Sequence, residues 1–233
     1  MQGTVLITGA GRGLGFALTQ SFLAAGFDVI ATHQKESCPD LDPLKTQHPG
    51  RLEVLQMNVL HETSIQAALE RVAGRVNHLD ILLNNAALCL DVNDPLDQVD
   101  FEVIQLQMDV NVYGPLRVTR AFLPLLEKSD RGILVNISSE AGSVGKCWRG
   151  TGFGYGMSKA ALNMQSRIFE KSLASRGIKV FAIHPGWMRT DMGGSDADIS
   201  AREAAQGILE IATSESYRDA SMFLVYNGEP YPY

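Results

Sequence analysis

The sequence is poor in cysteine, and its three cysteines are far apart. Cys38, Cys89 and Cys147 form no Cys-x-x-Cys pair and have no histidine at ligand spacing. Zinc sites and disulfide frameworks need such clusters, so this pattern excludes a disulfide scaffold and predicts no metal site. Free thiols of this kind are typical of the reducing cytoplasm, where we expect the protein to work.

Long apolar runs and an excess of basic residues are also missing. No apolar stretch approaches the roughly 18 residues that a membrane-spanning helix needs. The first residues lack the basic segment and apolar stretch of a secretory signal. Acidic residues outnumber basic ones by 26 to 20, and this net charge of -6 disfavours binding to a phosphate backbone. We therefore expect a soluble protein that binds neither nucleic acid nor membrane.

Short β-branched or apolar runs alternate with longer stretches of helical period. This order predicts an α/β doubly wound (Rossmann) fold, with a seven-stranded parallel sheet and helices on both faces. A chain of 233 residues suits one domain spanning residues 1–233, in which the proline-containing stretch Glu36–Gly50 is only a loop. The expected strands are Thr4–Thr8, Asp28–Thr32, Leu52–Gln56, Ile81–Leu83, Gly132–Ser138, Lys179–Ile183 and Ser221–Val225. The expected helices are Leu14–Ala25, Ser64–Val76, Asp97–Lys128, Tyr155–Ser175 and Ala201–Thr213.

The first expected strand runs directly into a glycine-rich turn, Thr8-Gly9-Ala10-Gly11-Arg12-Gly13-Leu14-Gly15. Glycines allow a tight turn and a close approach of the backbone to a pyrophosphate, whose charge is stabilised by the N-terminus of the next helix. The turn therefore predicts a dinucleotide site. The spacing Gly9-x3-Gly13-x-Gly15 differs from the commoner GxGxxG form, so a glycine-rich turn without a ligand is the alternative.

Polar residues follow two further expected strands, Asn84-Asn85-Ala86-Ala87 after the fourth and Ser138-Ser139 after the fifth. Ligands of doubly wound sheets bind outside the carboxyl ends of the strands, so we expect both segments at the same edge as the glycine turn. Each could also be an ordinary turn.

The long expected helix contains Asn111 four residues before Pro115. Proline has no backbone N–H, so the Asn111 carbonyl loses its helical partner and the helix is expected to open or kink there. The freed carbonyl can hold a water molecule. The alternative is a purely architectural kink.

Tyr155 and Lys159 begin the next expected helix and lie four residues apart, on one helical face. A nearby ammonium favours the phenolate form, so this spacing predicts a lowered Tyr155 pKa and a tunable acid or base. The alternative is a surface packing pair.

In this order, these motifs and His184-Pro185-Gly186-Trp187-Met188-Arg189-Thr190 resemble the short-chain dehydrogenase/reductase family over essentially the whole chain. The segment Thr190–Gly194 and the ending Asn227–Tyr233 are similar to the C-factor-like carbonyl reductases. The resemblance implies a catalytic tetrad of Asn111, Ser139, Tyr155 and Lys159, with Ser143 as the fallback for Ser139.

The resemblance also implies an NAD(P)-dependent oxidoreductase that transfers a hydride between a nicotinamide cofactor and a small-molecule carbonyl or alcohol. Tyr155 would be the general acid/base, and Ser139 would hold the substrate oxygen. Lys159 would lower the Tyr155 pKa and bind the nicotinamide ribose, while a water on Asn111 would relay protons. A homo-oligomer is a further expectation. The alternative function is a dinucleotide-binding redox sensor with little turnover, which would not need Tyr155 or Lys159.

The residues after the second expected strand indicate the cofactor. NAD-preferring relatives carry Asp where this chain has His33, which is followed by Gln34 and Lys35. These side chains offer donors without a negative charge, and Arg12 adds a cation, so NADPH is expected in preference to NADH. Candidates for the wall of the substrate pocket are Cys147, Trp148, Phe153, Trp187 and Met192. The expected cofactor residues are Gly9, Arg12, Gly13, Leu14, Gly15, His33, Gln34, Asn58, Val59, Asn85, Ala86, Tyr155, Lys159, Pro185, Gly186 and Thr190.

Overall fold

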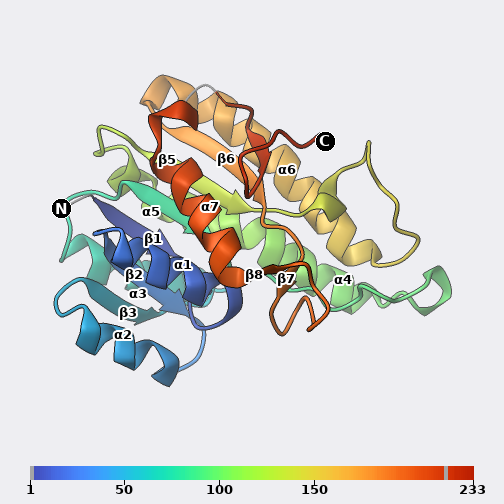
Figure 1. Cartoon of the computed structure of the whole chain (residues 1–233), viewed down its shortest axis with the longest axis horizontal. Helices are drawn as coiled ribbons and strands as arrows, with labels where there is room; N and C mark the ends of the chain where they lie inside the picture. The colour runs from blue at the N-terminus through green and yellow to red at the C-terminus, as the bar shows by residue number, and fades with distance from the viewer. Residues whose placement is uncertain (1–2, 218–219) are drawn as a thin grey trace.

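The computed structural model describes residues 3–217 and 220–233. Its main feature is one parallel sheet of order β3-β2-β1-β4-β5-β6-β9 (Figure 1). The strands are β1 (Thr4–Ile7), β2 (Asp28–His33), β3 (Leu52–Gln56), β4 (Ile81–Asn84), β5 (Ile133–Ile137), β6 (Lys179–His184) and β9 (Phe223–Val225). The helices are α1 (Gly13–Ala24), α2 (Asp42–Gln47), α3 (Glu62–Ala73), α4 (Phe101–Met108), α5 (Gly114–Leu126), α6 (Phe153–Leu173) and α7 (Ala201–Thr213). The expected fold class is confirmed.

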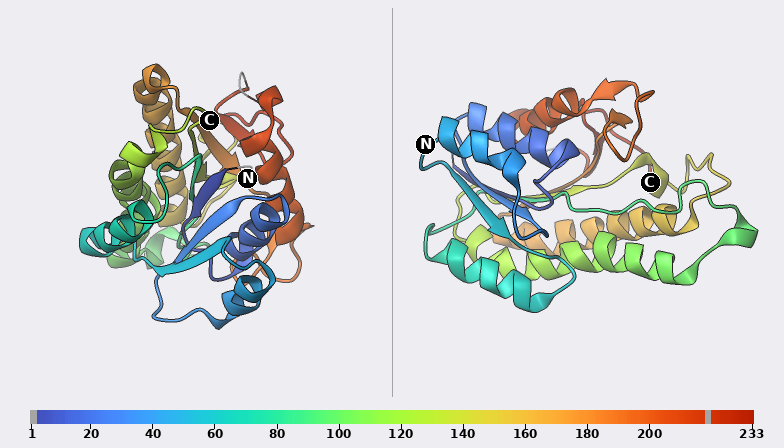
Figure 2. Two further views of the ribbon diagram at one scale, coloured as in Figure 1. Left: turned by 90° about the vertical axis from the view of Figure 1, so that its left-hand side faces the viewer. Right: turned by 90° about the horizontal axis from the view of Figure 1, so that it is seen from below.

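Helices cover both faces of this sheet, as Figure 2 shows. Alternation along β1 explains the two layers, because successive side chains of a strand point to opposite faces. Val5 and Ile7 pack into the core formed with α1 and α7, whereas Leu6 packs into the core formed with α3 and α5. All three are fully buried.

The order of the strands reverses at β1, which pairs with β2 on one side and with β4 on the other. The carboxyl ends of strands beside such a reversal are where α/β sheets bind ligands. The glycine turn follows β1, Asn85 follows β4 and Ser138 follows β5, so the topology brings the expected site segments to one edge.

The helix expected over Asp97–Lys128 begins later, at Phe101, and contains one wide turn before it ends at Leu126. The Asp100 side chain accepts the N–H groups of Glu102 and Val103 and so caps the start of α4. Between α4 and α5, residues Asp109–Tyr113 form one wide turn in which the Gly114 N–H donates to the Asp109 carbonyl. The opening expected ahead of Pro115 is therefore present as an insertion of one residue into the helical ladder.

Two short features were not expected from the sequence. The stretch interpreted as a loop, Glu36–Gly50, contains α2, which buries Leu44 against the α1 side of the core. The segment between β6 and α7 contains a two-stranded parallel ribbon, β7 (Met188–Arg189) and β8 (Ile199–Ser200). In the part of the chain that the structure describes, no helix combines the length and apolar character needed to cross a membrane.

Candidate active site

The turn between β1 and α1 depends on glycine at residues 9, 13 and 15, through lack of space or a positive φ. A Cβ on Gly15 would lie 2.2 Å from the Gly9 carbonyl oxygen and 2.6 Å from Nδ2 of Asn85, and Gly9 and Gly13 have positive φ values of 66° and 52°. In the described structure, α1 has neither a side-chain cap nor an acidic residue in its first turn. Its leading N–H groups thus suit an anion, and the cradle fits the pyrophosphate of a dinucleotide.

An asparagine pair at the end of β4 connects this cradle to the core. Asn85 donates from Nδ2 to the Thr8 carbonyl at 2.8 Å, and Oγ1 of Thr8 accepts the N–H groups of Asn85 and Ala86. Asn84 points into the interior, where its Nδ2 donates to Thr119 and Asn136. The amide side chains of this pair therefore fix the two strand ends to each other and to the core.

The expected adenosine end of the site lies after β2. His33 is buried, its Nδ1 has no hydrogen-bond partner among the described residues, and burial lowers the pKa of its ring. Gln34 and Lys35 are exposed beside it. Asn58, expected near the adenine, uses its Oδ1 to accept the Leu60 N–H in a local turn. An orphaned buried nitrogen at the carboxyl end of β2 is available to a ligand that reaches this edge.

Val59 and Leu14 are the apolar members of the expected cofactor set. Both side chains are buried. Val59 packs beneath Gly114, where an added Cβ would lie 3.0 Å from it, and Leu14 is in the α1 core. These two side chains therefore belong to the cores on opposite faces of the sheet.

Arg12 does not point toward His33. Its guanidinium pairs with Asp191, in the segment after β7, at 3.0 Å. Both side chains are more than 70% exposed, and exposed ion pairs contribute only about 0–1 kcal/mol. A phosphate group can displace so weak a partner. The phosphate contact expected for Arg12 stays a prediction.

The segment after β6 forms the opposite wall of the site. Gly186 has a φ of 81°, and a Cβ there would lie 2.6 Å from Ile199, so the turn at Pro185-Gly186 depends on glycine. Thr190 lies opposite the glycine turn, 3.5 Å from where a Cβ of Gly13 would be, and its hydroxyl accepts the Gly193 N–H.

Tyr155 lies in the first turn of α6, beside the end of β5. The pKa of its phenol is raised to about 12, chiefly by burial and also by the nearby Cys89, whereas a hydrogen bond with the Ser139 side chain lowers it. Ser138 is instead buried and donates to Asn163 of α6 at 2.6 Å. The fallback residue Ser143 accepts the Lys146 N–H. Of the three serines, it is Ser139 that contacts the phenol.

Lys159 is fully buried one helical turn after Tyr155. Its Nζ donates to the Ile137 carbonyl at 2.8 Å and lies 5.6 Å from the centroid of the Tyr155 ring. Burial lowers the pKa of this amine from 10.5 to about 8. The lowered Tyr155 pKa that the spacing predicts is wrong for this structure, because removal of the phenol from water raises the pKa more than the hydrogen bond with Ser139 lowers it.

Asn111 lies in the wide turn between α4 and α5. Its side-chain amide accepts the Leu88 N–H and donates to the Leu88 carbonyl, each at 2.8 Å, and it also donates to Oγ of Ser158. Ser158 in turn donates to the carbonyl of Tyr155. Asn111 is thus linked to Tyr155 through the Ser158 hydroxyl. The sequence motifs did not reveal this connection.

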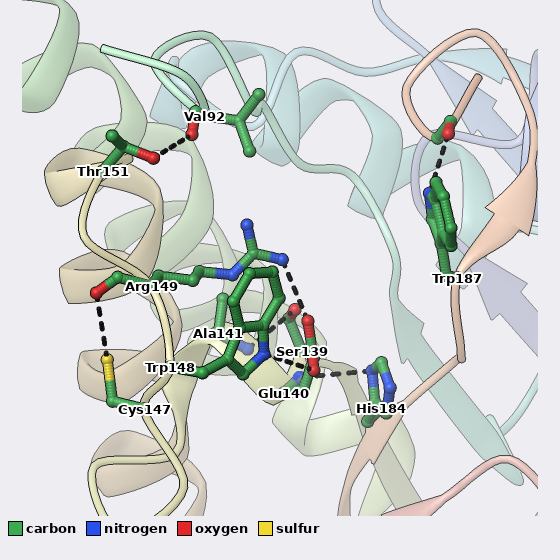
Figure 3. A network of polar contacts seen from close by, with 11 residues as sticks. Val92, Ser139, Glu140, Ala141, Cys147, Trp148, Arg149, Thr151, His184 and Trp187 are labelled. Carbon is green, nitrogen blue, oxygen red and sulfur yellow. Dashed lines mark hydrogen bonds and ion pairs between the residues drawn. The ribbon is translucent and has the colours of Figure 1, made fainter. Parts of the chain in front are cut away.

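A polar network connects the loop before α6 to Glu140, the residue after Ser139, as Figure 3 shows. Glu140 forms an ion pair with Arg149 at 2.9 Å and accepts a hydrogen bond from the Nε1–H of Trp148. The Trp148 ring stacks against the Arg149 guanidinium. On its other side, the Glu140 N–H donates to Nδ1 of His184. Trp187 is held apart, on the segment after β6, by a bond to the Gly193 carbonyl.

Sequence reasoning missed Glu140 and Arg149, as well as Cys89 and Asp91 near Tyr155. Cys89 is half-buried, and the pKa of its thiol is raised to about 11, chiefly by burial and also by the nearby Asp91. Of the expected wall residues, Cys147, Trp148, Trp187 and Met192 are exposed. No local pattern marks Cys89 or Asp91, because they approach Tyr155 only through folding.

Comparison with known proteins identifies relatives of the same architecture. A family model described as short chain dehydrogenase matches residues 3–199. The chain is 34% identical to the C-signal protein of Myxococcus xanthus over 155 residues, which are 66% of this chain and 93% of that protein.

Solved structures agree with this relationship. The NADPH-bound carbonyl reductase from chicken fatty liver matches with a TM-score of 0.92 and 32% identity, covering 99% of this chain and 98% of that chain. The carbonyl reductase Sniffer of D. melanogaster matches with a TM-score of 0.92 and 25% identity, covering 99% of both. The glycine cradle, the seven-stranded sheet and the match over residues 3–199 lead to one conclusion. This chain belongs to the short chain dehydrogenase family.

Proposed function

We propose that the protein is an NADPH-dependent reductase of small carbonyl compounds, with Tyr155 as the general acid. The observation that carries this proposal is the contact between the Tyr155 phenol and Ser139, with the Lys159 amine 5.6 Å from the phenol ring. These groups lie at the same sheet edge as the glycine cradle. A redox sensor would need the cradle but not a phenol, a serine and a buried lysine together.

The proposed chemistry is the addition of a hydride and a proton to a carbonyl group. Bound NADPH supplies the hydride. Tyr155 donates its proton to the carbonyl oxygen, and the Ser139 hydroxyl hydrogen-bonds the same oxygen. The raised pKa, about 12, keeps the Tyr155 phenol protonated at neutral pH, as a proton donor requires. Asn111 and Lys159 would bring a replacement proton from solvent.

The preference for NADPH rests on the residues at the end of β2. No carboxylate stands at the position of His33, and the exposed Gln34 and Lys35 add donors and a positive charge for a 2′-phosphate. Arg12 would exchange its exposed bond to Asp191 for that phosphate. The carbonyl reductase from chicken fatty liver, which matches over 99% of this chain, was crystallised with NADPH.

Substitution of the phenol tests the function. We expect Tyr155→Phe to lower kcat for carbonyl reduction by at least about 10²–10⁴-fold, because the hydroxyl is the proton donor. NADPH binding, followed by fluorescence titration, should remain. Tyr113→Phe is the matched control, since it removes an exposed hydroxyl on the same helical layer. Near-normal turnover in Tyr155→Phe would refute the assignment, and a wild-type protein that binds NADPH but reduces no simple carbonyl would favour the sensor.

A further inference from the structure

A buried carboxylate lies at the start of α6. Asp91 is only 5% exposed, and it accepts the Gly154 N–H at 2.5 Å and the Tyr155 N–H at 3.1 Å. Neither lysine nor arginine forms an ion pair with it in the described residues. Burial of an unpaired carboxylate is costly, so the two N–H groups and the positive end of the α6 dipole must stabilise it.

The close approach of Asp91 to α6 requires glycine on the helix side. A Cβ on Gly154 would lie 2.8 Å from Oδ2 of Asp91 and 2.6 Å from Nε2 of Gln107. Gly152, which has a φ of 74°, would place a Cβ 3.2 Å from the Cα of Val92. The contact is therefore built by the residue types on both sides and is not an accident of a flexible side chain.

The segment that carries Asp91 is itself fixed to α4 and the wide turn. Asn111 binds both backbone groups of Leu88, and Oε1 of Gln107 accepts the Leu90 N–H at 2.9 Å. Beyond Asp91, the Thr151 hydroxyl donates to the Val92 carbonyl at 2.9 Å. The loop after β4 thus connects one helical layer to the first turn of α6.

From this geometry we infer that Asp91 is a positioning residue for Tyr155. Its carboxylate fixes the backbone of the first turn of α6, so that the phenol stays beside Ser139 and near Lys159. Asp91 acts through the N–H groups of residues 154 and 155 and does not contact the reacting atoms. The inference rests on the proposed role of Tyr155 as the proton donor.

Kinetics of two Asp91 variants test this role. We expect Asp91→Ala to lower kcat by about 10²-fold, the effect of a displacement near 1 Å at a reacting group, while KM and NADPH affinity change by less than about 2-fold. Asp91→Asn keeps one of the two acceptor oxygens and should restore part of kcat. Asp100→Ala is the matched control, because Asp100 also accepts two N–H groups at a helix start, that of α4. It should lower Tm without changing kcat.

A spectroscopic measurement separates the inference from the proposed function. The ultraviolet titration of Tyr155, obtained by subtracting the Tyr155→Phe background, should move from a pKa near 12 toward 10 in Asp91→Ala, because the phenol becomes hydrated. This shift needs no turnover, so it stands even if carbonyl reduction is refuted.

If Asp91→Ala does not fold, Gly154→Ala gives the same test from the helix side, since its methyl group displaces the carboxylate. Three outcomes would overturn the inference. These are a kcat loss in Asp91→Ala no larger than in Asp100→Ala, a parallel loss of NADPH affinity, and an unchanged Tyr155 titration.

Discussion

Tyr155 and Lys159 are shifted in opposite directions by the same cause, burial. Removal from water disfavours the charged form of each group, so the pKa of the phenol rises and the pKa of the amine falls. At neutral pH the phenol keeps its proton with a margin of several units, whereas the amine keeps its proton with a margin of about one. Lys159 is therefore the member of the pair that titrates near physiological pH.

This difference predicts the pH dependence of the free enzyme. We expect kcat/KM for NADPH to fall above about pH 8 with the slope of one proton, because Lys159 loses its positive charge as pH rises through its lowered pKa. Tyr155 would not contribute to this limb, since its pKa lies near 12. Initial rates at saturating carbonyl and varied NADPH measure the profile.

The control is Lys159→Arg, whose guanidinium remains charged above pH 12. Whatever activity it keeps should show no decline near pH 8. A decline at the same pH in both proteins would assign the limb to another group.

Residue roles were predictable from the sequence only where a motif names them. The glycine turn and the Tyr155–Lys159 spacing are local patterns, so their place at one sheet edge followed from fold class. Asp191 is 179 residues from Arg12, and Asp91 is 64 residues from Tyr155, so their pairing depends on loops that meet only in the folded chain. Burial, which sets the direction of the Tyr155 pKa, is likewise a property of the folded chain.

At the scale of elements, the wide turn Asp109–Tyr113 interrupts the regular helical ladder between α4 and α5, which the periodicity predicts as one regular helix. Apolar residues recur at helical spacing on both sides of it, and the pattern alone does not register one extra residue. Pro115 marked the position of the wide turn correctly, because proline has no backbone N–H in any conformation. The capping role of Asp100 was also readable in principle, since Asp is a preferred N-cap residue.

Replacement of Pro115 tests whether the wide turn serves the reaction. We expect Pro115→Ala to hold or raise the free energy of unfolding while turnover falls, because the new N–H can bond the Asn111 carbonyl and regularise the helix. Denaturant unfolding checks the expected stability and kcat checks the expected turnover, both measured across the pH range.

Pro124→Ala is the matched control in the same helix. Pro124 is exposed inside α5, where its replacement restores an ordinary helical bond far from Asn111. Stability should rise there with unchanged kcat. If Pro115→Ala behaves in the same way as Pro124→Ala, the turn is only architectural.

At the scale of the whole molecule, the cofactor site joins segments from both halves of the sheet. The glycine turn follows β1, His33 ends β2 and Thr190 follows β6, so a dinucleotide bound along this edge would connect strands on both sides of the reversal. Binding energy at such a site stabilises the folded chain as a unit, since the unfolded chain has no site.

Thermal unfolding with cofactor therefore tests the preference for NADPH on the whole molecule. At a concentration of 100 Kd, a ligand adds about 2.7 kcal/mol to the free energy of unfolding, which corresponds to a rise in Tm of about 5–11 °C for a chain of this size. We expect NADPH to reach this shift at a concentration where NADH gives little. In His33→Asp, the new carboxylate repels the 2′-phosphate, so the order of the two shifts should reverse. Tyr155→Phe keeps the cradle and should keep the wild-type order. Equal shifts with both cofactors in the wild-type protein, or an unchanged order in His33→Asp, would show that the end of β2 does not select the cofactor.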